Sequence, residues 1–291
     1  MLTLVSAVLV GAQSASPSAR AARSPSLEAY SGSGSWVSIY DTAAWRHPEQ
    51  VVRTLASHRI HTLFLETSNY RQTVDIVRPR AVGRFLDAAR AARIAVVGWY
   101  LPSLANVRRD LRRAVAATDF RSAHGARFDS VALDIEATKV HPIVRRSDRA
   151  VQLAAALRRA VPSDYPLGAI TIAPVGASRS FWPGYPFRRL APSVDVILPM
   201  AYFTYRADGA ANVSSYTAAN LHLIRSRIGS ATFPIHPIGG EADKVTRPEL
   251  AAFLHVAACE AVGLSLWEYG EMKPRDWSAL ADAHAAGEPG C

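Results

Sequence analysis

The chain has 291 residues and is 49% hydrophobic, so it can bury the core of one large domain or of two small ones. Its formal charge of +9 comes almost entirely from arginine, because lysine occurs only at positions 139, 244 and 273. The arginines are scattered over expected helix faces, and the sequence has no long basic run and no aromatic-interleaved RNA motif. We therefore expect a solvated, arginine-rich surface and no nucleic-acid partner.

The N-terminal segment has the character of an export signal. Residues 2–10 form a mostly apolar run that is too short to span a bilayer, and small residues follow from Gly11 to Ser16. The positively charged start that such signals usually carry is missing. We expect residues 1–15 to be a signal peptide and residues 16–35 a low-complexity linker, in a secreted, extracellular protein without stable membrane insertion.

The two cysteines, Cys259 and Cys291, have no neighbours that indicate a catalytic thiol or a metal site. In an exported protein they could pair and tie down the C-terminus, but the sequence does not give the distance between them. Because no H-x-H or H-E-x-x-H motif occurs either, we expect no bound metal ion or cofactor.

From Trp36 onward, short runs of β-branched or aromatic residues alternate with helical segments of about ten to fifteen residues. This alternation is typical of βα units in a parallel sheet. Eight units predict a single (β/α)8 TIM barrel over residues 36–291, and no G-x-G-x-x-G motif supports the rival open doubly wound sheet. We expect strands at 36–40, 62–66, 94–100, 128–136, 167–173, 194–202, 233–238 and 264–267, and helices near 48–58, 81–92, 107–117, 148–161, 216–228, 248–262 and 277–285.

The fourth expected strand, F-D-S-V-A-L-D-I-E at residues 128–136, ends in two acids. Successive strand side chains point to opposite faces, so Asp134 and Glu136 share the inner face of the barrel. Hydrophobic burial does not explain them, because desolvating a carboxylate is costly. We expect Glu136, which is longer and nearer the rim, to be a general acid and Asp134 to orient or stabilise charge. The structural alternative is an ion pair with Lys139, Arg145 or Arg146.

The other expected strand ends carry aromatic and polar side chains that suit a sugar-binding cleft. Aromatic rings stack on the apolar faces of sugars, and paired carboxylates cleave glycosidic bonds. The irregular loop after the fifth strand contains several more aromatic residues, although core packing explains any single aromatic ring equally well. The expected substrate-binding residues are Tyr40, Glu66, Trp99, Tyr100, Trp182, Met200 and Trp267.

The fourth strand resembles the signature D-x-x-D-x-D-x-E of family 18 glycoside hydrolases, the group of chitinases and endo-N-acetylglucosaminidases. Asp129, Asp134 and Glu136 fall on its first, third and fourth acidic positions. Ala132 stands in place of the second acid, and Ser130 in place of the usual glycine.

Two further segments carry the resemblance. Leu198-Pro-Met-Ala-Tyr202 resembles the M-x-Y of that family, although Phe203 follows where aspartate is usual, and Trp267 resembles the tryptophan that ends its eighth strand. More broadly, the chain resembles uncharacterised actinobacterial secreted proteins of the glycosidase-like barrel superfamily. The resemblance implies that Glu136 protonates the glycosidic oxygen, that Asp134 positions an acetamido group acting as nucleophile, and that Tyr202 assists.

We therefore expect a secreted, monomeric glycoside hydrolase with a polysaccharide substrate, and two alternatives stay open. A carbohydrate-binding barrel without catalysis is favoured by Ala132 and disfavoured by the presence of both other acids. A metal-dependent hydrolase would need Asp134, Glu136 and His236 to meet in an oxygen-rich site, whereas a lone strand histidine is more often a hydrogen-bonded core residue.

Overall fold

The protein is a closed barrel of eight parallel strands, in which each strand pairs with its neighbours in chain order and the last strand pairs with the first. The computed structural model describes residues 25–176 and 181–283. This architecture confirms the predicted (β/α)8 barrel. The strands are β1 (Gly32–Val37), β2 (Thr62–Asn69), β3 (Ala95–Leu101), β4 (Ser130–Asp134), β5 (Leu167–Ile172), β6 (Val196–Met200), β7 (Ile238–Glu241) and β8 (Gly263–Trp267).

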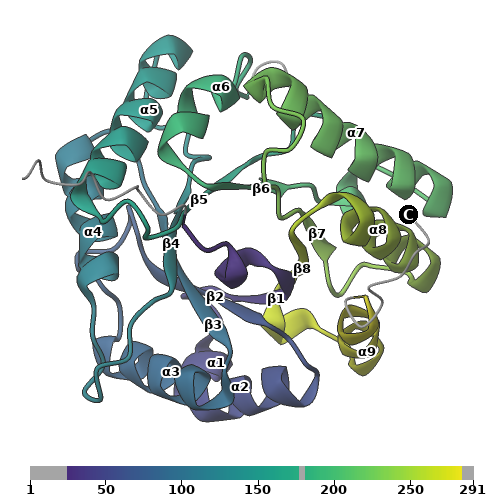
Figure 1. The fold of residues 1–291 in the computed structure, drawn as a ribbon, viewed down its shortest axis with the longest axis horizontal. Coiled ribbons are helices and arrows are strands. Elements are labelled where there is room, and N and C mark those ends of the chain that lie inside the picture. Colours follow the sequence, from purple (N-terminus) through teal and green to yellow (C-terminus); the bar gives the residue numbers. More distant parts are fainter. Residues whose placement is uncertain (1–24, 177–180, 284–291) are drawn as a thin grey trace, which may run out of the picture.

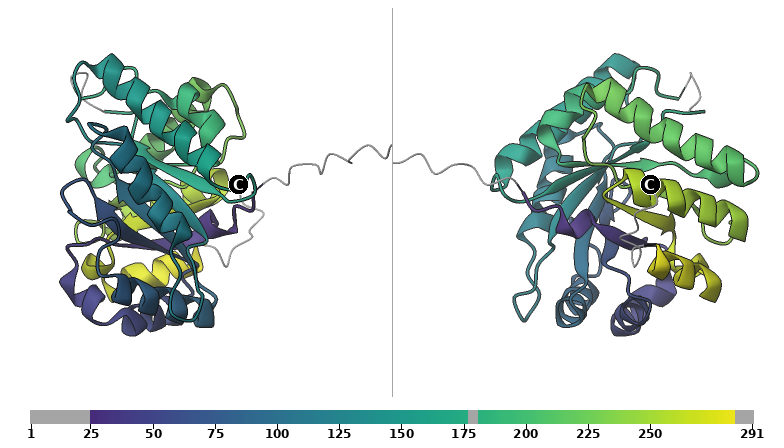
Figure 2. Two further views of the ribbon diagram at one scale, coloured as in Figure 1. Left: turned by 90° about the vertical axis from the view of Figure 1, so that its left-hand side faces the viewer. Right: turned by 45° about the vertical axis from the view of Figure 1, so that its right-hand side comes forward.

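Helices surround the barrel and cover its outer face (Figures 1 and 2). They are amphipathic, as in the third helix, where Val82, Phe85, Leu86 and Ala89 recur with helical spacing and are all buried. Within the two described ranges, no helix has both the length and the apolar character needed to cross a bilayer. The helices are α1 (Thr42–Arg46), α2 (Pro48–Ser57), α3 (Pro79–Ala92), α4 (Val107–Asp119), α5 (Ile143–Ala160), α6 (Phe187–Leu190), α7 (Ala210–Ile228), α8 (Arg247–Glu260) and α9 (Pro274–Asp282).

Strand alternation divides the core into two apolar layers. On β4, Leu133 faces outward and packs in the layer between strands and helices. Ala132 faces inward and joins Trp36 and Phe64 in the cluster that fills the barrel interior. Because Asp134 follows Ala132 by two residues, it lies on the same inner face, at the C-terminal end of the strand.

The first strand begins earlier than the sequence analysis indicated. β1 starts at Gly32, so residues 32–35 of the predicted linker belong to the barrel. A β-carbon at Gly34 would lie 2.5 Å from the ring of Phe64 on β2, so this position has no space for a side chain. The glycine-rich composition therefore reflects crowding inside the barrel and not a flexible chain.

The seventh strand also differs from its predicted span of 233–238. The ladder of β7 begins only at Ile238, and upstream of it Ile235 forms an isolated bridge to Ile197. Pro234 and Pro237 have no N–H group to donate, which explains why regular pairing is interrupted there.

Several predictions concern residues outside the described ranges. These are the signal peptide at 1–15, residues 16–24 of the linker, and Cys291 with its possible pairing to Cys259. They remain predictions.

Tyr30 closes the N-terminal end of the barrel. It ends the short 3-10 helix η1 (Glu28–Tyr30), and its ring is fully buried. The Tyr30 hydroxyl shares a 2.6 Å hydrogen bond with Oγ of Ser130 at the start of β4. A β-carbon at Gly168 on β5 would lie 2.5 Å from that hydroxyl. Tyr30 therefore fills this end of the barrel, whereas Asp134 lies at the opposite, C-terminal end of β4.

Candidate active site

Asp134 and Glu136 lie together at the C-terminal end of β4. Asp134 is 7% exposed, and its Oδ1 atom is buried without a hydrogen-bond partner. Burial raises the pKa of Asp134 well above its usual value, and the nearby carboxylates of Glu136 and Glu66 raise it further. Burial also raises the pKa of Glu136, while the positive charge of Arg71 acts in the opposite direction. The two acids therefore retain protons at a higher pH than ordinary carboxyl groups.

The acid pair does not form the structural ion pair considered as the alternative. In the described part of the chain, neither acid is paired with Lys139, Arg145 or Arg146. The guanidinium of Arg146 instead donates to the main-chain oxygens of Val140 and Phe181, at 3.1 and 2.8 Å.

A third carboxylate, Glu66 on the inner face of β2, is fully engaged with neighbouring groups. Its two oxygens accept hydrogen bonds from the main-chain N–H of Ile39 at 2.8 Å and from Nδ2 of Asn69 at 3.0 Å. Burial raises the pKa of Glu66 from 4.5 to about 7. Asn69 also lies 3.4 Å from the hydroxyl of Tyr40, whose ring is 61% exposed at the barrel mouth. Glu66 thus links β1, β2 and the rim, as well as adding charge near Asp134.

Three tryptophans meet inside the barrel near these acids. The ring centroids of Trp36, Trp99 and Trp267 lie 6.0 Å apart in each pair. Nε1 of Trp36 donates to Ser265, whereas Nε1 of Trp99 is buried without a partner. Trp267 and Trp99 were predicted, and Trp36 was not, because it was expected at the start of its strand and not at the C-terminal end.

Two tyrosines lie close to the acid pair. Burial raises the pKa of Tyr202 well above its usual value, and the charges of Asp134 and Glu136 add to the shift, so its hydroxyl stays protonated and able to donate. The hydroxyl of Tyr185 donates to the main-chain oxygen of Ile135 at 2.8 Å, between the two acids. Tyr185 was not singled out in the sequence, where the only signal was the aromatic composition of its loop.

Two predicted substrate-binding aromatics lie away from the mouth. Tyr100 faces outward and is fully buried against α4, where its hydroxyl donates to Asp110 at 2.7 Å. Trp182 is 2% exposed, and its Nε1 donates to Oγ of Ser147 on α5 at 3.0 Å. Both side chains pack between strands and helices, so neither reaches a sugar bound beside Asp134.

His236 lies at the other end of the barrel and does not join the acids. Its ring nitrogens lie 2.8 Å from the main-chain oxygen of Tyr30 and 3.1 Å from Oγ of Ser265. No group of three or more histidine, cysteine, aspartate or glutamate side chains within the described ranges is arranged to hold a metal ion. The geometry therefore does not support the metal-site alternative built on His236.

A cavity of about 310 Å³ opens beside Glu136. Met200 and Tyr202, both predicted, lie in its wall, together with Phe181 of the aromatic loop after β5 and with Tyr205 and Arg206, which were not predicted. The residues that matter for its chemistry are Glu136, Phe181, Met200, Tyr202, Tyr205 and Arg206.

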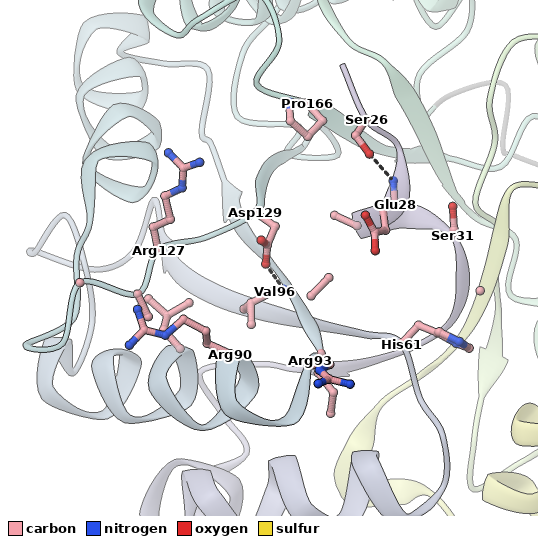
Figure 3. A pocket seen from close by; sticks show the side chains of 17 residues that line it. Ser26, Glu28, Ser31, His61, Arg90, Arg93, Val96, Arg127, Asp129 and Pro166 are labelled. Carbon is pink, nitrogen blue, oxygen red and sulfur yellow. Dashed lines mark hydrogen bonds between the residues drawn. The ribbon is translucent and has the colours of Figure 1, made fainter. Parts of the chain in front are cut away.

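A larger cavity of about 920 Å³ lies at the N-terminal end of the barrel (Figure 3). Asp129 lies in it and accepts a hydrogen bond from the main-chain N–H of Val96 at 2.8 Å. The first acid of the signature therefore has a structural role. The charged groups around it are Glu28, Arg90, Arg93 and Arg127.

No protein-family model and no curated protein matches this sequence. Many solved structures share its fold. An endo-1,4-beta-mannanase from Rhizomucor miehei has a TM-score of 0.66 at 8% identity, over 88% of this chain and 94% of that one. A chitinase from Chromobacterium violaceum has a TM-score of 0.65 at 13% identity, over 89% and 100%.

The spore cortex-lytic enzyme of Bacillus cereus has a TM-score of 0.62 at 10% identity, over 87% of this chain and 74% of that one. At such identities the likeness establishes the fold, a TIM barrel of the type found in chitinases and mannanases.

Proposed function

We propose that the protein is a secreted, monomeric glycoside hydrolase that cleaves a polysaccharide, with Glu136 as general acid and Asp134 as orienting carboxylate. The observation that carries the proposal is the buried Oδ1 of Asp134, which has no partner although it lies beside Glu136 in the barrel interior. Leaving such a group unsatisfied costs about 1–3 kcal/mol or more. A substrate that donates a hydrogen bond to Asp134 would recover this loss.

The chemistry follows from the protonation of the pair. Burial raises the pKa of both acids, and the charge of Glu136 raises that of Asp134 further, so the pair is protonated more readily than ordinary carboxyl groups. Glu136 lines the cavity and transfers a proton to the leaving glycosidic oxygen as the bond to the anomeric carbon breaks.

The resemblance to family 18 supports an acetamido group of the substrate as the nucleophile. Asp134 would accept the N–H of that group, and Tyr202 would donate to its carbonyl oxygen. That oxygen bonds to the anomeric carbon as the leaving sugar departs, and water then opens the cyclic intermediate. Chitinases among the similar solved structures support this substrate class.

The test is release of reducing ends from chitin, peptidoglycan and other glycans by the wild type and by Glu136→Gln. We expect the variant to lose about 10²- to 10⁴-fold in rate on the polymer that the wild type cleaves. Its melting temperature, measured in parallel, shows whether it is folded. Undiminished release by a folded Glu136→Gln protein would refute the assignment of the acid.

A carbohydrate-binding barrel without catalysis is the second candidate, and Ala132 favours it. This residue pairs directly across from Trp99 on β3 and offers no polar group to Asp134. The same screen separates the two functions, because binding of a glycan without any release of reducing ends would support the binding barrel.

A further inference from the structure

Two cations in the loops that follow β2 and β4 lie close to the ring of one tyrosine. Arg71, in the loop after β2, has its guanidinium carbon 5.4 Å from the ring centroid of Tyr70. Lys139, three residues after Glu136, has its ammonium 5.9 Å from the same centroid. Tyr70 thus brings the loops after β2 and β4 together, and with them two positive charges.

Neither Arg71 nor Lys139 forms an ion pair with any carboxylate in the part of the chain that the structure describes. Nε of Arg71 is 3.3 Å from the hydroxyl of Tyr70, and its charge is close enough to lower the pKa of Glu136. The positive charge is therefore available to a bound molecule beside the proposed acid.

The backbone of the loop that carries Arg71 is held in place by hydrogen bonds with Arg113 and Asn69. Arg113 on α4 is 2% exposed and donates to the main-chain oxygens of Asn69, at 2.7 Å, and of Gln72. The side-chain oxygen of Asn69 accepts from the main-chain N–H of Arg71 at 2.9 Å. Because Asn69 also donates to Glu66, the backbone at Arg71 is fixed to the same network as the acids.

A third cation, Arg206, lines the cavity that contains Glu136. Its side chain runs along Gly176, where a β-carbon would lie 3.4 Å from Cδ of Arg206. Among the residues with described positions, no carboxylate is paired with it. The nearby carboxylate of Glu241, by contrast, is already neutralised by Lys244. Exposed rings of Phe181 and Tyr205 flank the same cavity.

We propose that the substrate is an acidic polysaccharide, and that Arg71, Lys139 and Arg206 bind carboxylates of the sugars next to the cleaved bond. Arginine presents paired N–H groups that match a carboxylate, and aromatic walls pack against the sugar rings. The formal charge of +9 attracts a polyanion over longer distances. This inference rests on the proposed function, since it names the substrate class of the same cleft.

A uronic acid or a sugar with a lactyl ether can supply such a carboxylate, and the test distinguishes these two sources. The test measures binding to Glu136→Gln protein, so that no polymer is consumed. The probes are hyaluronan and polygalacturonate for uronic acids, peptidoglycan glycan strands for lactyl ethers, and neutral chitin oligosaccharides. Each acidic polymer is also tested after its carboxylates have been reduced to alcohols.

We expect at least one acidic polymer to bind about tenfold more tightly than its reduced form. In the Glu136→Gln background, adding Arg206→Gln, or Arg71→Gln with Lys139→Gln, should remove this preference, so that the acidic polymer and its reduced form bind with equal affinity. Adding Arg93→Gln, at the opposite end of the barrel, is the matched control and should keep it. Which polymer responds identifies the source of the carboxylate.

Equal affinity for every acidic polymer and its reduced form would overturn the inference, as would an equal loss with Arg93→Gln. Cleavage of neutral chitin without any preference for acid would remove the inference and leave the proposed hydrolase intact. A preference for acid without cleavage by the wild type would support the inference and contradict the hydrolase.

Discussion

The two ends of the barrel contain aspartates that differ in their hydrogen bonding. At the N-terminal end, the larger cavity holds Asp129, whose carboxylate accepts a main-chain hydrogen bond and lies among arginines. At the C-terminal end, the smaller cavity holds Glu136 beside Asp134, which has an unpartnered oxygen. The protein thus supplies a partner for Asp129 but leaves the buried Oδ1 of Asp134 without one, and a group already engaged within the protein cannot bind a ligand equally well.

The strongest test of this comparison substitutes Asp129, which precedes β4, and Asp134, which ends it. Asp134→Asn removes the orienting charge, and we expect the rate of polysaccharide cleavage to fall by about 10²-fold or more. Asp129→Asn keeps an acceptor for Val96 and should change the rate by less than about twofold. Comparable losses in both variants, measured as kcat/KM on the same polymer, would show that the two ends do not differ in function.

The pH dependence of the free energy of unfolding tests whether burial raises the pKa of Glu66. Its pKa is raised by burial to about 7, so the folded protein binds this proton more tightly than the unfolded chain. The resulting stability is fully present below about pH 4.5 and is lost as pH rises through about 7, up to about 3 kcal/mol. Denaturant unfolding across this range should show that Glu66→Gln lacks this part of the slope. An identical slope in both proteins would mean that the Glu66 pKa is not raised.

The smallest expected effect is a difference in KM between substitutions of two tryptophans, Trp99 and Trp182. Trp99→Phe removes an unpartnered N–H in the barrel interior, and we expect KM to rise about three- to tenfold because a substrate loses a hydrogen bond. Trp182→Phe removes a bond to Ser147 between strand and helix layers, so it should lower stability by about 1–3 kcal/mol and leave KM unchanged. A rise in KM for Trp182→Phe instead would place that residue in the cleft.

Much of the barrel could be predicted because its signals are local. Eight short apolar runs and seven amphipathic segments follow one another along the chain, and strand alternation places Asp134 on the inner face. The same alternation could have shown that Trp99 and Tyr100 do not both face the cleft, since adjacent strand residues point to opposite sides. The start of β1 was missed because its glycine and serine residues suit a linker as well as a crowded barrel wall.

Other parts of the site depend on contacts between distant segments. The network from Arg113 through Asn69 to Arg71 joins α4 with the loop after β2, and no local pattern indicates it. The position of Tyr185 near the acids depends likewise on how the loop after β5 folds back over β4. Such contacts are set by the closed barrel and not by sequence periodicity.

The most direct measurement of the central claim, that Glu136 is the proton donor, compares two leaving groups. A natural sugar needs a proton to leave, whereas a dinitrophenyl group does not. We predict that Glu136→Gln loses about 10²- to 10⁴-fold in rate on the natural glycan and much less on the matching dinitrophenyl glycoside. Equal losses on the two substrates would contradict the assignment of Glu136 as the general acid.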